Sequence, residues 1–425
     1  MSGNFPKDFL WGAATSAHQV EGGNLNDWSE WERHNAKRLA EEVKTRIAGE
    51  LGVTEKAAEK LLPPEAYIPE NYISGAAADH YHRFKEDFRN AESLGLNAIR
   101  FSIEWSRVEP MDGRFDAVQI AHYREVMRSL REHRLVPFIT LWHWTLPLWL
   151  RDRGGVMSPK FSDYFARYAA YIAAEFGNST NFWMTVNEPN TYAGQSYTLH
   201  GNWPPGIKGI FEMRRALKNL SMAHGKAYDA IRHVNPSAVI GPGIGTMLVE
   251  AARPANLLSW IVARFVSYVS NHYFLSLVKN KCDYIGVQYY FRLWIRALGK
   301  PRHGGENFSD MGWEIFPEGL YSVLKKMARY GKPLYITENG VADRADSKRA
   351  GFIVDHIASV RKALSDDIPV RGYFYWSLLD NFEWEKGFWP RFGLFAVDYK
   401  THERTMRPSA LQYKKVIEDS RASAR

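Results

Sequence analysis

Residues 182–189 read FWMTVNEP, and residues 333–340 read PLYITENG. In each stretch an apolar, β-prone run leads to a glutamate, Glu188 or Glu338, and a proline or glycine that interrupts strands follows closely. Parallel β/α folds carry their chemistry at the carboxyl ends of the strands. A lone glutamate is usually a solvated surface charge. Two glutamates that end buried strands predict a functional site at the carboxyl ends of the strands.

Eight strand-like runs occur along the chain. They begin near Phe9, Ala98, Val136, Phe182, Ala238, Tyr284, Leu334 and Val370. Between them lie apolar residues at helix spacing, as in 81–94 and 164–176, each followed by a glycine. No glycine-rich phosphate-binding fingerprint follows the first run. The alternation predicts an α/β fold made of a single closed (β/α)8 barrel over residues 1–425, and not an open doubly wound sheet.

Residues 33–62 stand apart from this alternation, because they are rich in Ala, Glu, Lys and Arg. Apolar residues recur every four positions over 39–51, Gly52 ends the run, and Thr54 is placed to cap a second short helix. We therefore expect a helical insertion, with its loop covering 33–75, in the first β→α connection beside the barrel mouth. A lid, an interface and an inert decoration are all open, and decoration is the interpretation that we favour.

The bulk composition limits the class of protein. The chain has 425 residues, of which 45% are hydrophobic and 14% aromatic, enough for a large core. The single cysteine, Cys282, excludes an intramolecular disulfide and a multi-cysteine metal site, and it fits a reducing compartment. The opening residues MSGNFP lack the basic and apolar regions of a secretory signal, so we expect a cytoplasmic protein.

Neither a membrane nor a nucleic acid is an expected partner. The most apolar segment, 257–278, is interrupted by Arg264, Asn271 and His272, and it predicts an amphipathic helix of the barrel rather than a membrane span. The formal net charge is +8, but Lys and Arg are interspersed with Glu and Asp, which favours a solvated surface over a nucleic-acid site. The oligomeric state stays open.

Two carboxylates at one rim suit the cleavage of a glycosidic bond. In its oxocarbenium-like transition state one carboxylic acid protonates the departing oxygen, while a second carboxylate attacks the anomeric carbon or activates water. Arg100, in the second predicted strand, is placed to hold a nearby carboxylate ionised. His143 ends the third run between two tryptophans, where a sugar-hydroxyl contact is favoured over a structural role. No metal-ligand spacing surrounds it, so neither a metal nor another cofactor is expected.

At these motifs the chain resembles the family 1 glycoside hydrolases, which are retaining β-glycosidases such as β-glucosidases with a TIM barrel fold. The resemblance extends from residues 5–12 to residues 407–410, and its motifs are specific in combination. It implies that Glu188 is the general acid and then the general base, and that Glu338 is the nucleophile. It also implies, with Arg100 beside the nucleophile, a set of substrate-binding residues: Gln19, His143, Trp144, Asn187, Tyr290, Trp313, Trp376, Glu383 and Trp384.

The chain departs from the family pattern at a few positions. Gln288 stands where asparagine is usual, which affects a hydrogen bond beside the site rather than the reaction. Residues 274–284 form a shorter stretch than usual, so we expect a more open aglycone side. Glu383, as a carboxylate that accepts two sugar hydroxyls, would repel a phosphate group and predicts unphosphorylated glycosides as substrates.

The leading hypothesis is a retaining exo-β-glycosidase that removes terminal β-D-glucosyl residues from short glycosides and oligosaccharides by double displacement, with galactosyl and fucosyl residues left open. A transglycosylase would use the same site, with a sugar acceptor in place of water. A catalytically silent sugar-binding barrel is the alternative from another class, and the presence of both glutamates argues against it.

Overall fold

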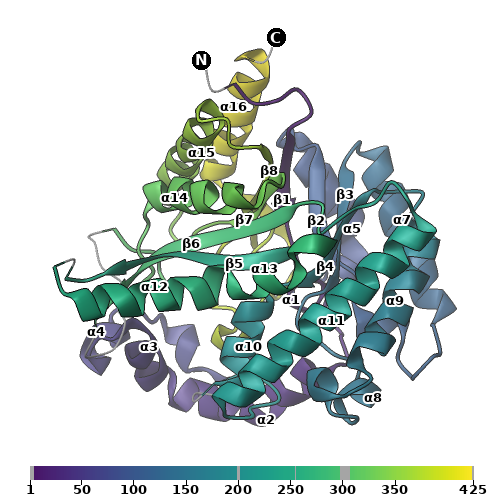
Figure 1. The fold of residues 1–425 in the computed structure, drawn as a ribbon, viewed down its shortest axis with the longest axis horizontal. Helices are drawn as coiled ribbons and strands as arrows, with labels where there is room; N and C mark the ends of the chain where they lie inside the picture. Colours follow the sequence, from purple (N-terminus) through teal and green to yellow (C-terminus); the bar gives the residue numbers. More distant parts are fainter. Residues whose placement is uncertain (1–3, 199–201, 254, 297–306, 424–425) are drawn as a thin grey trace.

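The computed structural model describes residues 4–198, 202–253, 255–296 and 307–423. Its centre is a closed barrel of eight parallel strands that follow one another in chain order (Figure 1). The strands are β1 Leu10–Ala14, β2 Ala98–Ser102, β3 Val136–Trp142, β4 Phe182–Asn187, β5 Val239–Ala251, β6 Ile285–Ile295, β7 Leu334–Asn339 and β8 Val370–Trp376. Because β1 pairs with both β2 and β8, the predicted closed (β/α)8 barrel is confirmed.

Helices connect the strands and surround the barrel. The longer ones are α5 His80–Ser93, α7 Ala117–Glu132, α9 Phe161–Phe176, α11 Ile210–Val234, α12 Leu257–Asn271, α14 Pro317–Met327, α15 Arg349–Ser365 and α16 Pro408–Ser423. Shorter ones are α1 Ala17–Val20, α6 Trp105–Val108, α8 Leu148–Arg151, α10 Pro189–Tyr197 and α13 Tyr273–Val278, and β9 Phe395–Val397 pairs with β10 Arg404–Met406 beside the barrel. The two helices expected from spacing, α5 and α9, begin and end within three residues of the prediction.

Aromatic side chains fill the barrel interior. The rings of Phe138, Phe182, Tyr284, Tyr335 and Phe374 meet with neighbouring centroids 5.3 to 5.8 Å apart. These residues lie on or next to five different strands, so their rings can meet only inside the closed sheet. Most of them lie near the amino ends of the strands, which leaves the carboxyl ends open for polar side chains. Part of the high aromatic content is therefore core packing.

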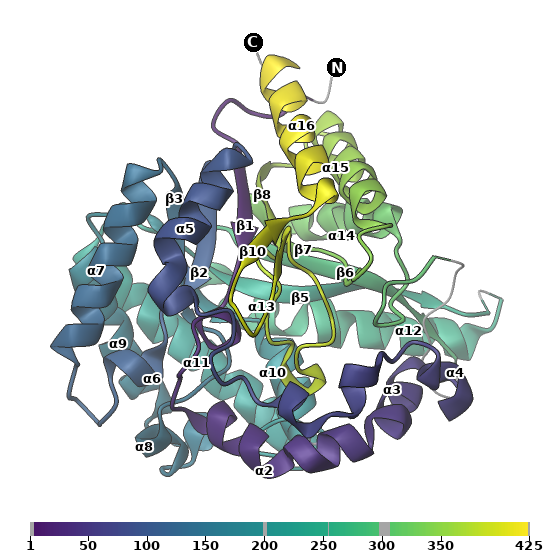
Figure 2. The same cartoon turned by 180° about the vertical axis from the view of Figure 1, so that it is seen from behind.

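The segment expected as a helical insertion contains α2 Asp27–Glu41, α3 Val43–Leu51 and α4 Glu55–Glu59. It begins earlier than residue 33, because the Asn26 side chain caps α2 by accepting from the Ser29 amide. Gly52, in the left-handed region at φ 67°, ends α3, and Thr54 caps α4, as the sequence predicted. Figures 1 and 2 show α2 and α3 across the side of the barrel opposite the two chain termini, where the carboxyl ends of the strands lie.

The apolar segment 257–278 differs from the single amphipathic helix that was expected. It forms two helices, α12 and α13, separated at His272. On α12 the residues buried against the barrel side include the small Ser259 and Ala263, whereas Leu257 is 70% and Phe265 is 65% exposed. α12 therefore packs closely on the sheet through small residues and leaves several large apolar side chains exposed.

The strands β5 and β6 continue beyond the barrel, pairing from Leu248 with Arg292 to Ala251 with Ile295. Together with α12 they form a projecting layer, which is visible at the left of Figure 1. Within the described ranges, no helix is long and apolar enough to cross a membrane.

Candidate active site

Glu338 lies in β7, one residue before its end, and is held by two polar contacts. The Arg100 guanidinium, fully buried in β2, forms an ion pair with Glu338 Oε1. The Tyr290 hydroxyl, from β6, donates to Glu338 Oε2 at 2.6 Å. A positive charge and a hydroxyl donor both stabilise a negative charge on Glu338.

Glu188 directly follows β4 and precedes α10, which starts with a proline at its first position. Its backbone adopts φ 40° and ψ 56°, the left-handed region that non-glycine residues seldom occupy and that is often found at functional sites. Glycine at position 245 permits this placement, since a Cβ there would lie 2.7 Å from Glu188 Cδ and 2.6 Å from Thr191 Oγ1. The backbone of β5 therefore passes close beside the Glu188 carboxyl, where a larger residue would collide with it.

The environment of Glu188 favours the protonated acid. Burial raises the pKa of Glu188 to about 8, and the negative charge of Glu338 raises it as well. A hydrogen bond from Thr191 and the charge of Arg100 act in the opposite direction but are smaller effects. The two carboxyl groups thus differ: one is ion-paired, and the other retains its proton near neutrality.

Asn187 connects the residues around these carboxyl groups. Its Oδ1 accepts from Arg100 at 2.6 Å and from Gln288 at 2.7 Å, so its amide nitrogen is free to donate to His143 Nε2 at 3.1 Å. Gln288, the departure from the family pattern, therefore keeps a hydrogen bond within the site. The longer side chain still reaches the amide that positions His143.

His143 is a neutral imidazole with one ring nitrogen available. Burial lowers its pKa well below the usual value, and the charge of Arg100 contributes. Since Nε2 accepts from Asn187, the proton is on Nδ1, which is buried without a protein partner in the part of the chain that the structure describes. Such a donor suits a hydroxyl group of a ligand.

Tryptophans surround His143 at the same rim. The ring of Trp376, at the end of β8, stacks beside His143 with centroids 6.1 Å apart, and Trp384 does so at 5.8 Å. Trp144 packs against Trp384 at 4.7 Å. These rings form an aromatic floor and wall of the kind on which the C–H faces of a sugar stack.

Gln19 and Glu383 lie side by side at the edge of this aromatic group. Gln19, in α1, donates through Nε2 to the Phe382 carbonyl at 2.8 Å and to Glu383 Oε2 at 3.4 Å. Burial raises the pKa of Glu383 to about 8, although the charge of Lys386 lowers it. A protonated Glu383 repels a phosphate group less than the carboxylate assumed from the sequence.

Lys386 was missed by the sequence analysis, although it continues the segment that carries Glu383. Its ammonium group forms ion pairs with Glu385 at 2.6 Å and with Glu50 of α3 at 3.1 Å, and the side chain is buried. A cation with two carboxylate partners has little charge left for a phosphate. The case for unphosphorylated sugars therefore rests on this pairing more than on the charge of Glu383.

Trp313 and the inserted helix α3 meet at the same rim of the barrel. The Trp313 indole donates to Glu50 Oε1 at 3.4 Å, and its ring lies 5.8 Å from that of Tyr290. From the same helix, Arg46 donates to the backbone carbonyl of Glu385 at 3.2 Å. Helix α3 therefore contacts two segments of the candidate site, and the interpretation of the insertion as decoration stays a prediction.

All the predicted site residues lie within the described part of the chain, and the carboxyl ends of the strands and their following loops carry them. In that part, no group of three or more His, Cys, Asp or Glu side chains is arranged to hold a metal ion. A protonated and an ion-paired carboxyl group at the open end of a (β/α)8 barrel, beside tryptophan rings, define a glycoside hydrolase.

Comparison with known proteins also gives a glycoside hydrolase, and it identifies the family. The sequence model of Glycosyl hydrolase family 1 matches residues 1–54, 62–287 and 275–422. The chain belongs to this family, and the resemblance seen in its motifs is confirmed. Within the helical segment the family match leaves out only residues 55–61, which include the whole of α4.

Relatives of known name cover almost the whole chain. Beta-glucosidase A of Thermotoga maritima is 32% identical, with 98% of both chains aligned. A beta-galactosidase of Sulfolobus acidocaldarius is 32% identical over 97% of this chain and 95% of its own. Among solved structures, a beta-glycosidase from Pyrococcus horikoshii superposes with a TM-score of 0.84 at 33% identity, covering 99% of this chain and 96% of the other.

Proposed function

We propose that this glycosidase removes terminal β-D-glucosyl or galactosyl residues from unphosphorylated short glycosides with retention of configuration, Glu338 being the nucleophile and Glu188 the acid/base. The observation that carries the proposal is the contrast between the two carboxyl groups. Glu338 is paired with Arg100 and Tyr290, whereas Glu188 is buried with a pKa of about 8. Their surroundings favour an ionised Glu338, which can attack, and a protonated Glu188, which can act as the acid.

In the first step a Glu338 oxygen attacks the anomeric carbon, and the bond to the departing oxygen breaks. Glu188 gives its proton to that oxygen, so the aglycone leaves as a neutral alcohol. The product is a glycosyl ester on Glu338, which no longer carries a charge. Arg100 and Tyr290 hold the carboxylate in place until the attack.

In the second step Glu188 acts as a general base instead of a general acid. Esterification removes the Glu338 charge that helped to raise the pKa of Glu188, so the new Glu188 carboxylate is stable without its proton. It takes a proton from water while the water oxygen attacks the anomeric carbon and frees Glu338. The sugar leaves with its original configuration, and both carboxyl groups return to their starting states.

The polar residues around the aromatic floor account for recognition of a single terminal sugar. His143 offers Nδ1–H and Asn187 borders it, which suits hydroxyls next to the reacting carbon. Gln19 and Glu383 lie together at the other edge, which suits the outer hydroxyls. The relatives named beta-glucosidase and beta-galactosidase differ in substrate at one such hydroxyl, and both kinds support the proposed sugar class.

Trapping the ester tests the proposal directly. The protein is incubated with 2-deoxy-2-fluoro-β-glucosyl fluoride and with its galacto analogue, and the adduct is located by peptide mass mapping. We expect one sugar on the peptide that carries Glu338, and none in Glu338→Gln. Glu318→Gln, an exposed glutamate on α14, is the matched control and should label like the wild type. An adduct on another residue, or hydrolysis with inversion, would refute the assignment.

A further inference from the structure

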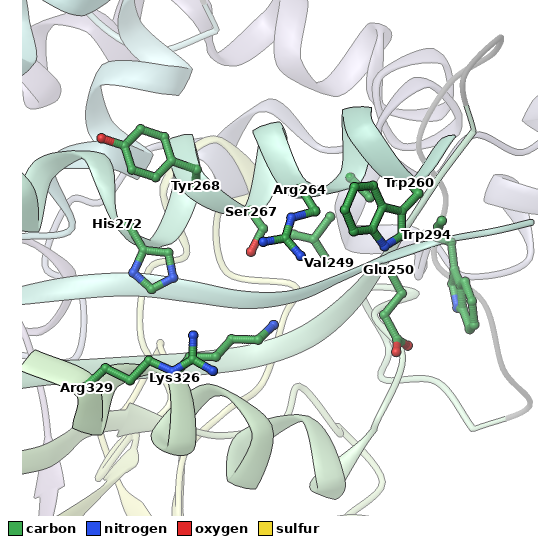
Figure 3. A pocket seen from close by; sticks show the side chains of 12 residues that line it. Val249, Glu250, Trp260, Arg264, Ser267, Tyr268, His272, Trp294, Lys326 and Arg329 are labelled. Carbon is green, nitrogen blue, oxygen red and sulfur yellow. The ribbon is translucent and has the colours of Figure 1, made fainter. Parts of the chain in front are cut away.

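A cavity of about 660 Å³ lies away from the candidate active site, in the layer formed by α12, the projecting ends of β5 and β6, and the segment from α14 into the 3₁₀ turn η5 Ala328–Tyr330. None of the predicted sugar-binding residues lines it. Its volume is in the range of small-molecule sites. Figure 3 shows basic side chains from α12 and from the α14–η5 segment directed into the space between these elements.

Three cations line this cavity: Arg264 from α12, and Lys326 and Arg329 from the opposite wall. The lining also includes Glu250, but this carboxylate already pairs with Arg292 at 3.3 Å. Among the residues that the structure places, neither a carboxylate ion pair nor an accepting hydrogen-bond partner is found for any of the three. The lining of the cavity, with three cations and one carboxylate, therefore carries more positive than negative charge.

The surroundings of Lys326 act on its pKa in both directions. Burial lowers the pKa of Lys326, and the positive charges of Arg329 and Arg264 lower it further, while Glu250 raises it. All three cations line the same cavity, so one anion bound there would lie near each of them. A bound anion would relieve their repulsion and gain charge-assisted hydrogen bonds.

Aromatic rings form the other part of the wall. Trp260 is 45% exposed, and the Arg264 guanidinium lies over its ring at 4.6 Å. Trp294 is half-buried, with its indole Nε1 lacking a hydrogen-bond partner in the described chain. Two tryptophan rings in the same lining as these cations suit a ligand with a flat or apolar group next to its charge.

We propose that this cavity is a second binding site, which takes an organic phosphate: the phosphate group on Arg264, Lys326 and Arg329, and an aryl or alkyl group against Trp260 and Trp294. A soluble phosphate ester and a phospholipid head group share this chemistry. The site is independent of the catalytic carboxyl groups, so it stands or falls separately from the proposed glycosidase mechanism.

Calorimetric titration with 1-naphthyl phosphate, in the presence of excess glucose to occupy the sugar site, measures the binding. Inorganic phosphate and uncharged 1-naphthol are titrated separately. We expect naphthyl phosphate to bind at least tenfold more tightly than either, because only it uses both halves of the cavity. The double variant Lys326→Gln/Arg329→Gln should weaken binding at least tenfold and leave glycoside hydrolysis unchanged.

The matched control is Lys325→Gln/Lys332→Gln, which removes the same charge from neighbouring positions that do not line the cavity. It should bind within twofold of the wild type. Trp260→Ala should weaken naphthyl phosphate at least fivefold while inorganic phosphate is unaffected. Sedimentation with phosphatidylglycerol vesicles separates the sources: binding that the Lys326→Gln/Arg329→Gln variant loses assigns a lipid head group, and its absence beside tight naphthyl phosphate binding assigns a soluble ester.

Three outcomes would overturn the inference. One is no binding of naphthyl phosphate or of the vesicles by the wild-type protein. Another is equal loss in the control double variant, which would mean that overall charge and not this cavity attracts the anion. The third is inorganic phosphate binding as tightly as the ester, which would remove the role given to the tryptophans.

Discussion

Replacing Glu338 by glutamine tests how far one carboxyl group sets the protonation of the other. Burial raises the pKa of Glu188 to about 8, with the Glu338 charge as the second cause. Two unit charges about 5 Å apart, the separation of a retaining pair, interact by roughly 3 kcal/mol at an effective dielectric constant of about 20. Since about 1.4 kcal/mol corresponds to one pH unit, we expect the pKa of Glu188 to fall to about 6 in Glu338→Gln.

Carbon-13 NMR of glutamate-labelled protein measures this titration. The wild type should show two carboxyl groups that titrate near pH 8, because burial also raises the pKa of Glu383 to about 8. The variants Glu188→Gln and Glu383→Gln each remove one signal and so assign them. In Glu338→Gln the Glu188 signal should move by about two pH units, and the Glu383 signal by less, because the Glu338 charge is a minor cause there.

The outcome that would refute this reasoning is a Glu188 signal that still titrates near pH 8 in Glu338→Gln. Burial alone would then set the pKa, and esterification of Glu338 could not convert the acid into a base. The charge of Arg100 could not explain an unchanged pKa of Glu188. In this variant Arg100 loses its carboxylate partner, and its positive charge lowers the pKa of Glu188 further.

Four further results are expected. As pH rises through about 8, kcat/KM should fall, because Glu188 must hold its proton to act as the acid; a constant rate to pH 10 would contradict this. Glu188→Ala should slow natural disaccharides about 100-fold more than dinitrophenyl glycosides in single-turnover assays, because a good leaving group needs no proton, and equal losses would argue against the role. Gly245→Ala should lower kcat/KM about 100-fold with unchanged circular dichroism, since the new methyl collides with Glu188, whereas Gly194→Ala meets open space and should stay within about twofold. Glu50→Gln should raise KM for aryl glycosides several-fold at similar kcat, by releasing Lys386 and Trp313, while the surface variant Glu59→Gln should not.

Much of the fold was predictable from local patterns. A buried strand needs an apolar run and a residue that stops it, and both lie next to each other in the sequence, as at Phe182–Asn187 and Leu334–Asn339. The glycine at 52 and the threonine at 54 marked helix ends for the same reason. The length of β5 and β6 was missed, because their extensions pair only with each other and with α12, which no local pattern reveals.

The candidate site likewise combines features that the sequence predicted with contacts that it did not. Its two glutamates follow from their positions at strand ends, and the family resemblance supplied the surrounding residues. The contact of Gly245 with Glu188, and the bond of Glu50 with Lys386, join positions far apart in the chain. Nothing in the local sequence marks either contact, since each depends on which strands and helices become neighbours when the barrel closes.

The sequence by itself determined the alternation of strands and helices, the family, and the placing of Glu188 and Glu338 at the carboxyl ends of two strands. Only the tertiary structure decided that Glu383 is buried enough to keep its proton, that α3 contacts Trp313, and that α12 turns apolar residues outward beside a basic cavity. The physical reason is that periodicity and turn chemistry act between neighbours in the chain. Burial and electrostatic interaction act through space, among groups that only the folded barrel brings together.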